Sequence, residues 1–328
     1  MSIHLERRRL ILSSASASAL SLLGMPSARA QDQAGKPIRL VVGFAAGTAP
    51  DSVTRSLGRQ LEENLRTTVV VDNRPGAGGV LALANVGASP ADGTTLLVAT
   101  VGEIAISPHL YRKIPFDPVR LVPVSEVLTG DVTFVVASQV PVKSMQEFLQ
   151  WSRGKPTLLI GTFGPGTPHH LVSALLAETT KRKIEPVHYR SVGDALTGLV
   201  MGELDGAFVS SALAKAWQQT GKVTVLAVST PHRSPIFPDV QTLREAGLAG
   251  AEFGGWVGVF APPGTTPEAA DKLNASVVAA ARAPAVKTAM EALGFTIRGT
   301  SREDFERVVA SDRARFGKLI ESLGLKLD

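Results

Sequence analysis

Ile38-Arg39-Leu40-Val41-Val42 is a short, β-branched run that leads directly into the loop Gly43-Phe44-Ala45-Ala46-Gly47-Thr48-Ala49-Pro50-Asp51. Such a run predicts a buried strand. Beyond the loop, an apolar residue recurs at every fourth position, at Val53, Leu57, Leu61 and Leu65. This spacing predicts a helix with one apolar stripe, and we expect Asp51 to cap it with its carboxylate.

The same order of strand, loop and helix recurs along the chain. Further strands are predicted at positions 68–71, 95–99, 134–137, 158–160, 186–189, 207–209 and 223–228. Helices are predicted at 144–151 and 171–180 and, beyond Pro262-Pro263, to the end of the chain. This alternation is typical of an α/β fold around a mostly parallel sheet. A second glycine-rich loop, Gly161–His170, also joins a predicted strand to a helix, which indicates two α/β lobes.

The two glycine-rich loops are the candidate ligand site. In open α/β sheets, ligands bind beyond the carboxyl ends of the strands, where the next helix presents unpaired N–H groups. Those donors and the helix dipole favour an anion such as a carboxylate or phosphate, and the hydroxyls of Thr48 and Thr167 add donors. Two such loops, facing each other from two lobes, would hold the two ends of a small anion. The alternative for either loop alone is a tight connection with no ligand.

Length and composition exclude several classes of protein. The chain has 328 residues, of which 44% are hydrophobic and 19% are charged, and it contains no cysteine. This length accommodates about two domains, and the apolar fraction excludes wholesale disorder. Absence of cysteine excludes disulfides, thiolate zinc sites, iron–sulfur clusters and cysteine nucleophiles.

Residues 1–30 have the pattern of a secretory signal peptide. Arg7-Arg8-Arg9 precedes a mildly apolar stretch, and Ala28-Arg29-Ala30 is a small-residue cleavage motif. We expect cleavage after Ala30, and both the Sec and the twin-arginine routes of export stay open. Loss of four arginines and one glutamate with this segment lowers the formal charge from +5 to +2. Little basic excess then remains for nucleic acid, and no nucleic acid partner is expected.

The sequence lacks the usual signatures of enzymes and metal sites. It has no Walker phosphate loop, no dinucleotide fingerprint, no Gly-x-Ser-x-Gly elbow and no H-E-x-x-H. We therefore expect no catalytic residue, no metal and no cofactor. His169 and His170 open a helix and point in different directions, so at most one of them faces a ligand.

Short motifs follow one another in a characteristic order from Lys36-Pro37-Ile38-Arg39 to the last helix. They are Asn73-Arg74-Pro75-Gly76-Ala77-Gly78-Gly79, Ala91-Asp92-Gly93, His109-Leu110-Tyr111-Arg112-Lys113, Phe116-Asp117-Pro118, Arg233-Ser234-Pro235, Glu245-Ala246-Gly247-Leu248 and Trp256 with Gly258. In their order and spacing the chain resembles the Bug family of periplasmic solute receptors, which serve tripartite tricarboxylate transporters. The resemblance implies a two-lobe periplasmic-binding-protein type II (Venus flytrap) fold that passes an organic anion to a membrane permease.

On this resemblance, lobe 1 takes residues 31–132 and 257–328, and lobe 2 takes residues 133–256. Two crossing strands near Phe134 and Trp256 would form the hinge. The expected partners are a small organic carboxylate and the permease subunits of the transporter. The protein is expected to be a monomer in the periplasm.

Carried over residue by residue, the ligand contacts of the family fall on both loops and on the end of one strand. They are Gly47, Thr48, Ala49, Asp51, Thr162, Gly164, Gly166, Thr167, His170 and Ser210. The first loop departs from the family's P-F-x-P-G-G-x-x-D pattern, and Phe208-Val209-Ser210 stands where the family has F-D-N. These departures leave room for a ligand with a more apolar or aromatic body, and the identity of the carboxylate stays open.

Two other functions stay open at this stage. One is an exported enzyme acting on a small carboxylic acid, with His170 as general base and Asp51 or Asp205 orienting it. The other is a ligand sensor that signals to a sensor kinase in a two-component system instead of feeding a permease.

Overall fold

The structure is a computed structural model that describes residues 36–76, 79–164, 167–189, 191–230, 232–234, 236–251 and 254–326. The predicted signal peptide and its cleavage point after Ala30 lie outside these residues. The chain from Lys36 onward forms one compact unit.

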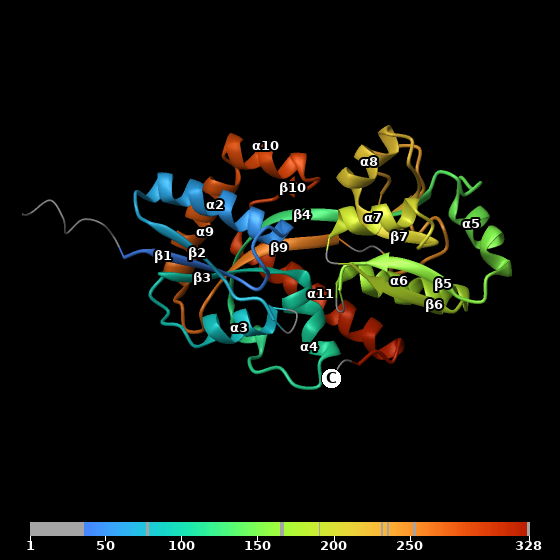
Figure 1. Cartoon of the computed structure of the whole chain (residues 1–328). Coiled ribbons are helices and arrows are strands. Elements are labelled where there is room, and N and C mark those ends of the chain that lie inside the picture. The colour runs from blue at the N-terminus through green and yellow to red at the C-terminus, as the bar shows by residue number, and fades with distance from the viewer. Residues whose placement is uncertain are drawn as a thin grey trace, which may run out of the picture. The chain divides into compact units, whose positions relative to one another are not determined.

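Strand β4 (Val122–Ala137) joins two groups of elements and has 16 residues. Its first half pairs with β9 (Gly254–Ala261) and β10 (Thr296–Ile297), and its second half pairs with β7 (Gly206–Ser210) and β8 (Val223–Val228). Figure 1 shows β4 in green and β9 in orange crossing from one group to the other. The predicted strand at 134–137 is therefore only the last part of a much longer one.

Two sets of parallel strands flank this crossing pair. In the first group, β1 (Ile38–Val42) lies between β2 (Val69–Asn73) and β3 (Thr95–Thr100). In the second, β5 (Leu158–Thr162) lies between β6 (Ile184–His188) and β7. The full order is β2-β1-β3-β9-β4-β7-β5-β6. The α/β class is confirmed, but the antiparallel pairs made by β4 and β9 make the sheet mixed rather than mostly parallel.

The helices follow the predicted alternation. The α-helices of the described residues are α2 (Ala49–Leu65), α3 (Val80–Gly87), α4 (Ser107–Leu110), α5 (Met145–Trp151), α6 (Pro168–Thr180), α7 (Val192–Val200), α8 (Ser211–Gln219), α9 (Pro267–Ala281), α10 (Pro284–Ala292) and α11 (Arg302–Ser322). Shorter helices are the π-helix η2 (Gly102–Ile106) and the 3-10 helices η3 (Pro118–Arg120) and η4 (Ser152–Gly154). The C-terminal segment is helical as predicted, except that β10 lies between α10 and α11.

The apolar stripe of α2 packs in the core of the first group. Val53, Leu57 and Leu61 are at most 2% exposed and cluster with residues of α9, α10 and the strands. The fourth member of the stripe, Leu65, is 42% exposed. It is exposed because the helix ends there, with Arg66 in the left-handed conformation as its C-cap.

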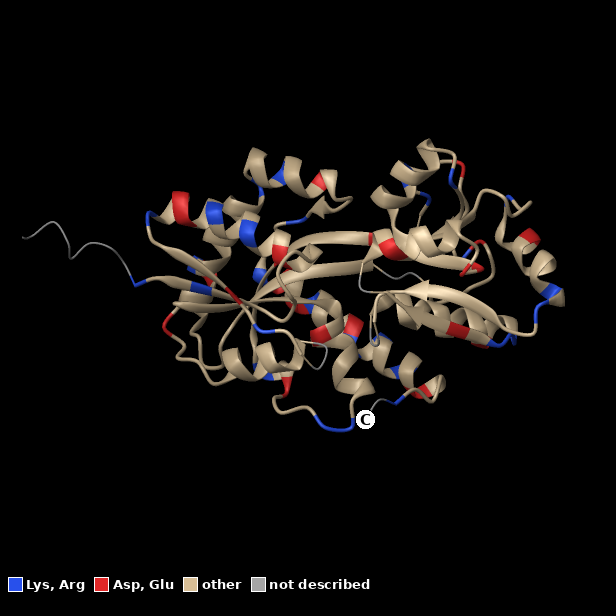
Figure 2. Ribbon diagram, in the orientation of Figure 1, with Lys and Arg blue, Asp and Glu red and all other residues tan. Residues whose placement is uncertain are grey.

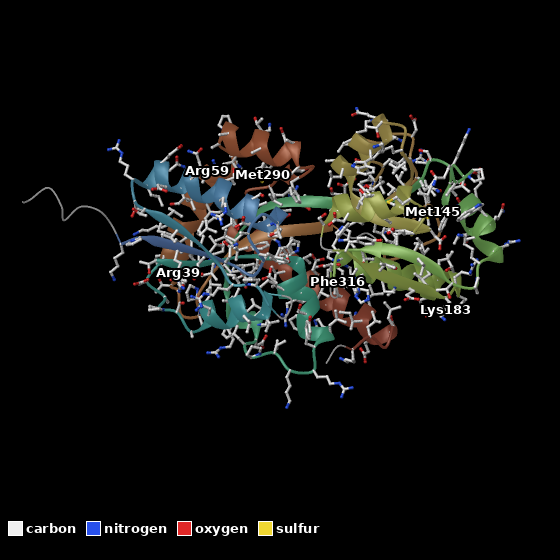
Figure 3. All side chains as sticks on the ribbon, in the orientation of Figure 1. Arg39, Arg59, Met145, Lys183, Met290 and Phe316 are labelled. Carbon is white, nitrogen blue, oxygen red and sulfur yellow. The ribbon has the colours of Figure 1, made fainter. Side chains whose placement is uncertain are left out.

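The core of the second group includes a cluster of aromatic rings. Phe134 of β4 packs against Phe148 and Phe208, with ring centroids 5.1 Å and 4.8 Å away. In Figure 3, Met145 lies at the start of α5 in this group, whereas Met290 lies in α10 of the other group. β4 thus contributes side chains to both cores.

Charged residues of both signs are interspersed over both groups, as Figure 2 shows. This distribution agrees with the small net charge left once the first thirty residues are set aside. Among the described residues, no helix combines the length and apolar character needed to cross a membrane.

Gly258 of β9 tests how tightly the strand is packed. A Cβ at this position would overlap the ring of Phe305, whereas a Cβ at Gly255 in the same strand would meet nothing within 4 Å. We expect Gly258→Ala to lower the free energy of unfolding by about 1–3 kcal/mol, because a buried ring must move. Gly255→Ala, the matched control, should change it by no more than about 0.5 kcal/mol. Urea unfolding followed by circular dichroism measures both, and equal effects would contradict the packing described.

Candidate functional site

Each parallel set of strands contains a point where the chain reverses its direction of winding. The chain leaves β1, forms β2 on one side of it, and then returns to form β3 on the other side. β5 has the same relation to β6 and β7. Ligand crevices in α/β sheets open at such switch points, beyond the carboxyl ends of the strands. The loops Gly43–Asp51 and Gly161–His170 follow β1 and β5, so both lie where a ligand is expected.

The first loop is organised around the buried carboxylate of Asp51, which is 2% exposed. Its Oδ2 accepts hydrogen bonds from the Gly47 backbone N–H at 2.8 Å and from Arg55 Nε at 3.0 Å. Its Oδ1 accepts from Asn73 Nδ2 at 2.8 Å, and the same Asn73 nitrogen donates to Phe44 O. Asp51 therefore ties the loop to both α2 and β2.

Asp51 does not cap α2 as the sequence predicts, because Thr48 is the N-cap and Asp51 lies within the first turn. Burial would raise the pKa of Asp51, but the hydrogen bonds from Arg55, Asn73 and Gly47 outweigh it and hold this pKa below its ordinary value. The carboxylate is thus charged and fully bonded at neutral pH.

The hydroxyl of Thr48 donates to Ala45 O at 2.8 Å, so its hydrogen is used inside the first loop. The backbone N–H groups of Ala49 and Asp51 have no partner within α2, since they belong to its first turn, and Pro50 has no N–H. Gly47 and Ala49 are exposed. The donors that this loop offers to an anion are therefore backbone groups.

The second loop has the same design at the start of α6. Thr167 is the N-cap: its hydroxyl donates to Gly164 O at 2.9 Å and accepts from the His170 backbone N–H at 3.3 Å. Pro168 again has no N–H, which leaves the N–H of His169 without a partner within the helix. Gly166 lies outside the described residues, and Gly164 is half-buried with φ +89°.

Thr162 and His170 come together with a residue that the sequence analysis did not select. Thr162 Oγ1 and His188 Nδ1 are 2.6 Å apart, and the rings of His188 and His170 meet edge to face with centroids 5.2 Å apart. His188 ends β6 and is exposed, directly beside the end of β5. A polar residue at the carboxyl end of a predicted strand was the signal that could have identified it.

Both histidines of this pair are neutral at pH 7. Burial, with a smaller contribution from His188, lowers the pKa of His170 to about 4, and burial also lowers the pKa of His188. With a pKa of about 4, His170 would be a weak base at neutral pH, which makes it a poor match for the general base of the enzyme hypothesis. Asp205, one of its suggested orienting residues, binds Lys155 Nζ at 2.5 Å and the Leu159 N–H at 2.9 Å instead.

Ser210 lies at the carboxyl end of β7, which is the other strand of the second switch point. It is half-buried and is the N-cap of α8, without a side-chain cap bond. The next residue, Ser211, is buried, and its Oγ lies 2.5 Å from both Asp131 Oδ2 and Thr133 Oγ1 of β4. The end of β7 is therefore tied to β4 at the place where that strand passes between the groups.

Glu103 was not selected from the sequence, although a lone carboxylate in the apolar run 101–106 is a recognisable signal. It lies in η2, just beyond β3, and is fully buried. Burial raises the pKa of Glu103 to about 8. The backbone N–H and the hydroxyl of Thr100 donate to Oε2, and these hydrogen bonds lower the pKa by less than burial raises it. Its Oε1 has no hydrogen-bond partner among the described residues.

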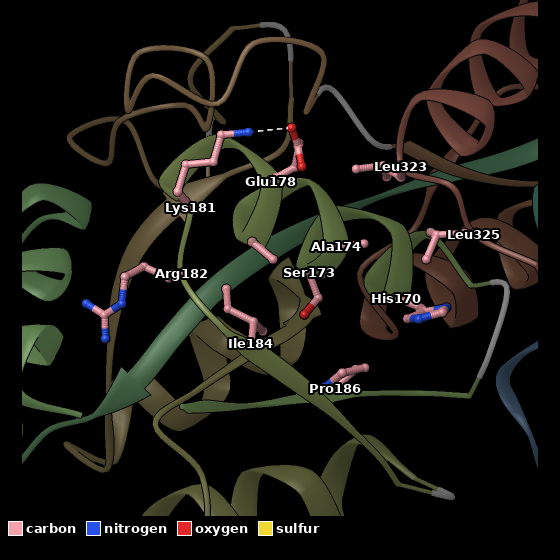
Figure 4. Close-up of a pocket in the computed structure, with 11 residues that line it drawn as sticks. His170, Ser173, Ala174, Glu178, Lys181, Arg182, Ile184, Pro186, Leu323 and Leu325 are labelled. Carbon is pink, nitrogen blue, oxygen red and sulfur yellow. Dashed lines mark hydrogen bonds and ion pairs between the residues drawn. The ribbon is translucent and has the colours of Figure 1, made fainter. Parts of the chain in front are cut away.

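A cavity of about 480 Å³ lies along the side of α6, between this helix, β6 and the C-terminal residues Leu323 and Leu325. Figure 4 shows His170 near one end and the Lys181–Glu178 ion pair at the other. The helix presents its side to this cavity rather than its N-terminal N–H groups, so we do not assign the cavity to the anion site. Among the described residues, no group of three His, Cys, Asp or Glu could hold a metal ion.

Comparison with known proteins identifies the class of protein. The family model described as "Tripartite tricarboxylate transporter family receptor" matches residues 53–325. The chain therefore belongs to this receptor family, whose members are periplasmic solute-binding proteins, and the predicted family is confirmed. BugT of Bordetella pertussis is 30% identical over 297 residues, which cover 89% of this chain and 90% of BugT.

Two solved structures are similar along most of the chain. Rpa4515 of R. palustris, solved with adipate, has a TM-score of 0.79 and 29% identity, and the match covers 90% of this chain and 100% of that one. MatC of Rhodopseudomonas palustris, solved with bound malate, has a TM-score of 0.76 and 29% identity, with 87% and 98% covered. The periplasmic-binding-protein fold predicted from the sequence is confirmed by these matches.

The role of Asp51 in the first loop can be tested by removing its carboxylate. Asp51→Ala should lower the free energy of unfolding by roughly 1–3 kcal/mol, because it leaves the Gly47 N–H without its acceptor and removes one of the two acceptors of the Asn73 amide. Because the pKa of Asp51 is lowered in the folded state, this loss should be largest above the ordinary aspartate value of 3.8 and shrink as the pH falls below it.

The matched control is Asp271→Ala, which removes an exposed ion pair with Arg302. This substitution should lower the free energy of unfolding by at most about 1 kcal/mol. Chemical denaturation at several pH values measures both variants. Equal losses, or a loss for Asp51→Ala that does not depend on pH, would show that the carboxylate does not organise the loop.

Proposed function

We propose that this protein captures a small organic carboxylate between two lobes in the periplasm and delivers it to the permease subunits of a tripartite tricarboxylate transporter. The observation that carries the proposal is that the same kind of loop lies at both switch points. In each loop the threonine hydroxyl, of Thr48 or Thr167, donates to a carbonyl of the loop itself. The backbone N–H groups at the start of the following helix are then the donors left for an anion. The relatives solved with malate and adipate support a carboxylate as that anion.

The lobes we propose are residues 31–132 with 257–328, and residues 133–256. The pairing of β4 with β9 at Thr129 and Trp256 supports a hinge at this place, because these two antiparallel strands join the groups. Closure of such a hinge around a ligand would form the surface that a permease recognises. We propose that the protein acts as a monomer.

The ligand contacts we propose are the ten residues carried over from the family, with His188 added on its contact with Thr162. Gly47, Thr48, Asp51 and Thr167 act by shaping the loops, since the Gly47 N–H is bonded to Asp51. Ala49 and the first turn of α6 act through backbone N–H groups. Cleavage after Ala30 and the absence of catalysis are part of the same proposal. The low pKa of His170, which makes it a weak base, and the occupied carboxylate of Asp205 support a binding protein over an enzyme.

Thermal-shift screening of the mature chain tests the function. The panel holds mono-, di- and aromatic carboxylates, including malate and adipate. A ligand at 100 times its dissociation constant should stabilise the protein by about 2.7 kcal/mol, which raises the melting temperature measurably. If no organic anion raises it, the receptor proposal is wrong. Each hit is also incubated with the protein and followed by NMR, and turnover would favour the enzyme instead.

The N-cap of α6 gives a test of the site with a matched control in the same chain. Thr167 and Thr266 are both N-caps that precede a proline and accept a backbone N–H at 3.3 Å, but Thr266 caps α9, which begins at neither switch point. Replacing either by alanine should cost about 0.5–2 kcal/mol of stability. Only Thr167→Ala should weaken binding of the screened carboxylate, by about tenfold, because the loop that presents the donors loosens. Unchanged affinity by isothermal titration calorimetry would remove this loop from the site.

A further inference from the structure

The first switch point contains a buried carboxyl group that the proposed function does not use. Glu103 follows β3, and its side chain reaches toward the start of the first loop. A Cβ added to Gly43, directly after β1, or to Gly79, at the start of α3, would overlap Glu103 Oε1. The Glu103 side chain therefore lies against both Gly43 and Gly79, next to the carboxyl end of β1.

The hydrogen bonds of Glu103 involve only one of its two oxygens. Oε2 accepts from the Thr100 N–H at 2.8 Å and from the Thr100 hydroxyl at 3.2 Å, so this oxygen acts as an acceptor. Oε1 is buried and has no partner in the part of the chain that the structure describes. A neutral carboxyl group with its hydrogen on Oε1 is consistent with this arrangement, since a buried charge without a partner is costly.

In the part of the chain that the structure describes, no cation is paired with Glu103. The elements packed against η2 are β3, α4, η3 and α11. Their titratable and charged side chains are His109 on α4, Arg120 on η3, and Arg302, Glu303, Asp304, Glu306, Arg307, Asp312, Arg313, Arg315, Lys318 and Glu321 on α11. Among the described residues, none of these pairs with or hydrogen-bonds to Glu103. Arg313, whose backbone belongs to α11, donates instead to the Ile104 carbonyl at 2.8 Å.

We propose that Glu103 forms the floor of the anion site in the first lobe and that it must be neutral for a carboxylate to bind above it. This inference rests on the proposed function, because it assumes an anion at the first loop. A neutral Glu103 leaves the dipole of α2 and its backbone donors unopposed, whereas an ionised Glu103 would place a negative charge beneath the ligand in a region of low dielectric constant. Anion binding and protonation of Glu103 would therefore favour each other.

This coupling has a defined pH dependence. Glu103 in the free protein ionises near its raised pKa of about 8. A bound carboxylate would raise that pKa further, so between the free and bound values the affinity falls by up to about tenfold for each pH unit. His170 and His188 are neutral throughout this range, because burial lowers their pKa values.

The experiment measures the dissociation constant of a carboxylate found by the screen, by isothermal titration calorimetry between about pH 6.5 and 9.5. The proteins are the mature wild-type chain, Glu103→Gln and a control, Glu126→Gln, which alters another buried glutamate located on β4. Above pH 8 the affinity of wild type and of the control should fall by up to about tenfold for each pH unit, and the affinity of Glu103→Gln should stay constant. The α-amino group titrates in the same range but is present in all three proteins.

A second measurement keeps the test independent of how well the glutamine variant folds. The carboxyl carbon of Glu103, followed by NMR in ¹³C-glutamate-labelled wild type, should titrate near pH 8 without ligand and at higher pH with it. Affinity of the wild type that does not change with pH, or an equal titration midpoint with and without ligand, would overturn this inference alone. Failure of every carboxylate to bind at any pH would instead overturn the proposed function.

Discussion

The sharing of one strand between two groups of elements is the constraint on which the structure depends. β4 is hydrogen-bonded to β9 and β10 in its first half and to β7 and β8 in its second. Its registers shift between Pro123 and Ser125, between Glu126 and Leu128, and between Phe134 and Val135. Such irregularities bend a strand, and a bend allows one strand to belong to two differently oriented sets. Both switch points, and hence both loops, take their positions from this strand and its neighbour β9.

Two buried carboxyl groups lie at the first switch point, and their pKa values are shifted in opposite directions. Asp51 has three donors around its two oxygens, so it stays charged in spite of its burial. Glu103 has donors on one oxygen only, and burial prevails, so it is neutral at pH 7. The charged group is bonded away from solvent and fixes the shape of the loop. The neutral one adds no negative charge at the first switch point.

The local patterns of the sequence predict most strands and helices, the stripe of α2 and both loops. The length of β4 is not predictable in this way, because Pro123, Ser125 and Glu126 interrupt any apolar or alternating pattern. Glu126 is nevertheless buried, since Arg298 from a distant segment lies 3.7 Å away. The part that Asp51 plays in holding the first loop and the buried position of Glu103 were missed for the same reason. Asp51 is bonded to Asn73, and Glu103 lies against Gly43 and Gly79, and these contacts join residues that are distant in sequence. Pairings between remote segments determine burial and bonding, and a local pattern does not contain them.

The antiparallel pairing of β3 with β9 joins residues such as Leu97 and Phe260, which are far apart in the chain. Everything from β4 to β8 is synthesised between them. While the chain is being made, the edge of β3 has no partner strand until the last third has emerged, yet the intervening segment already holds β5, β6 and β7, which pair among themselves and with β4. The middle of the protein can therefore fold before its beginning. An exposed strand edge during synthesis favours pairing with the wrong strand, so the first group is the part of the chain most open to such mispairing until β9 has been made.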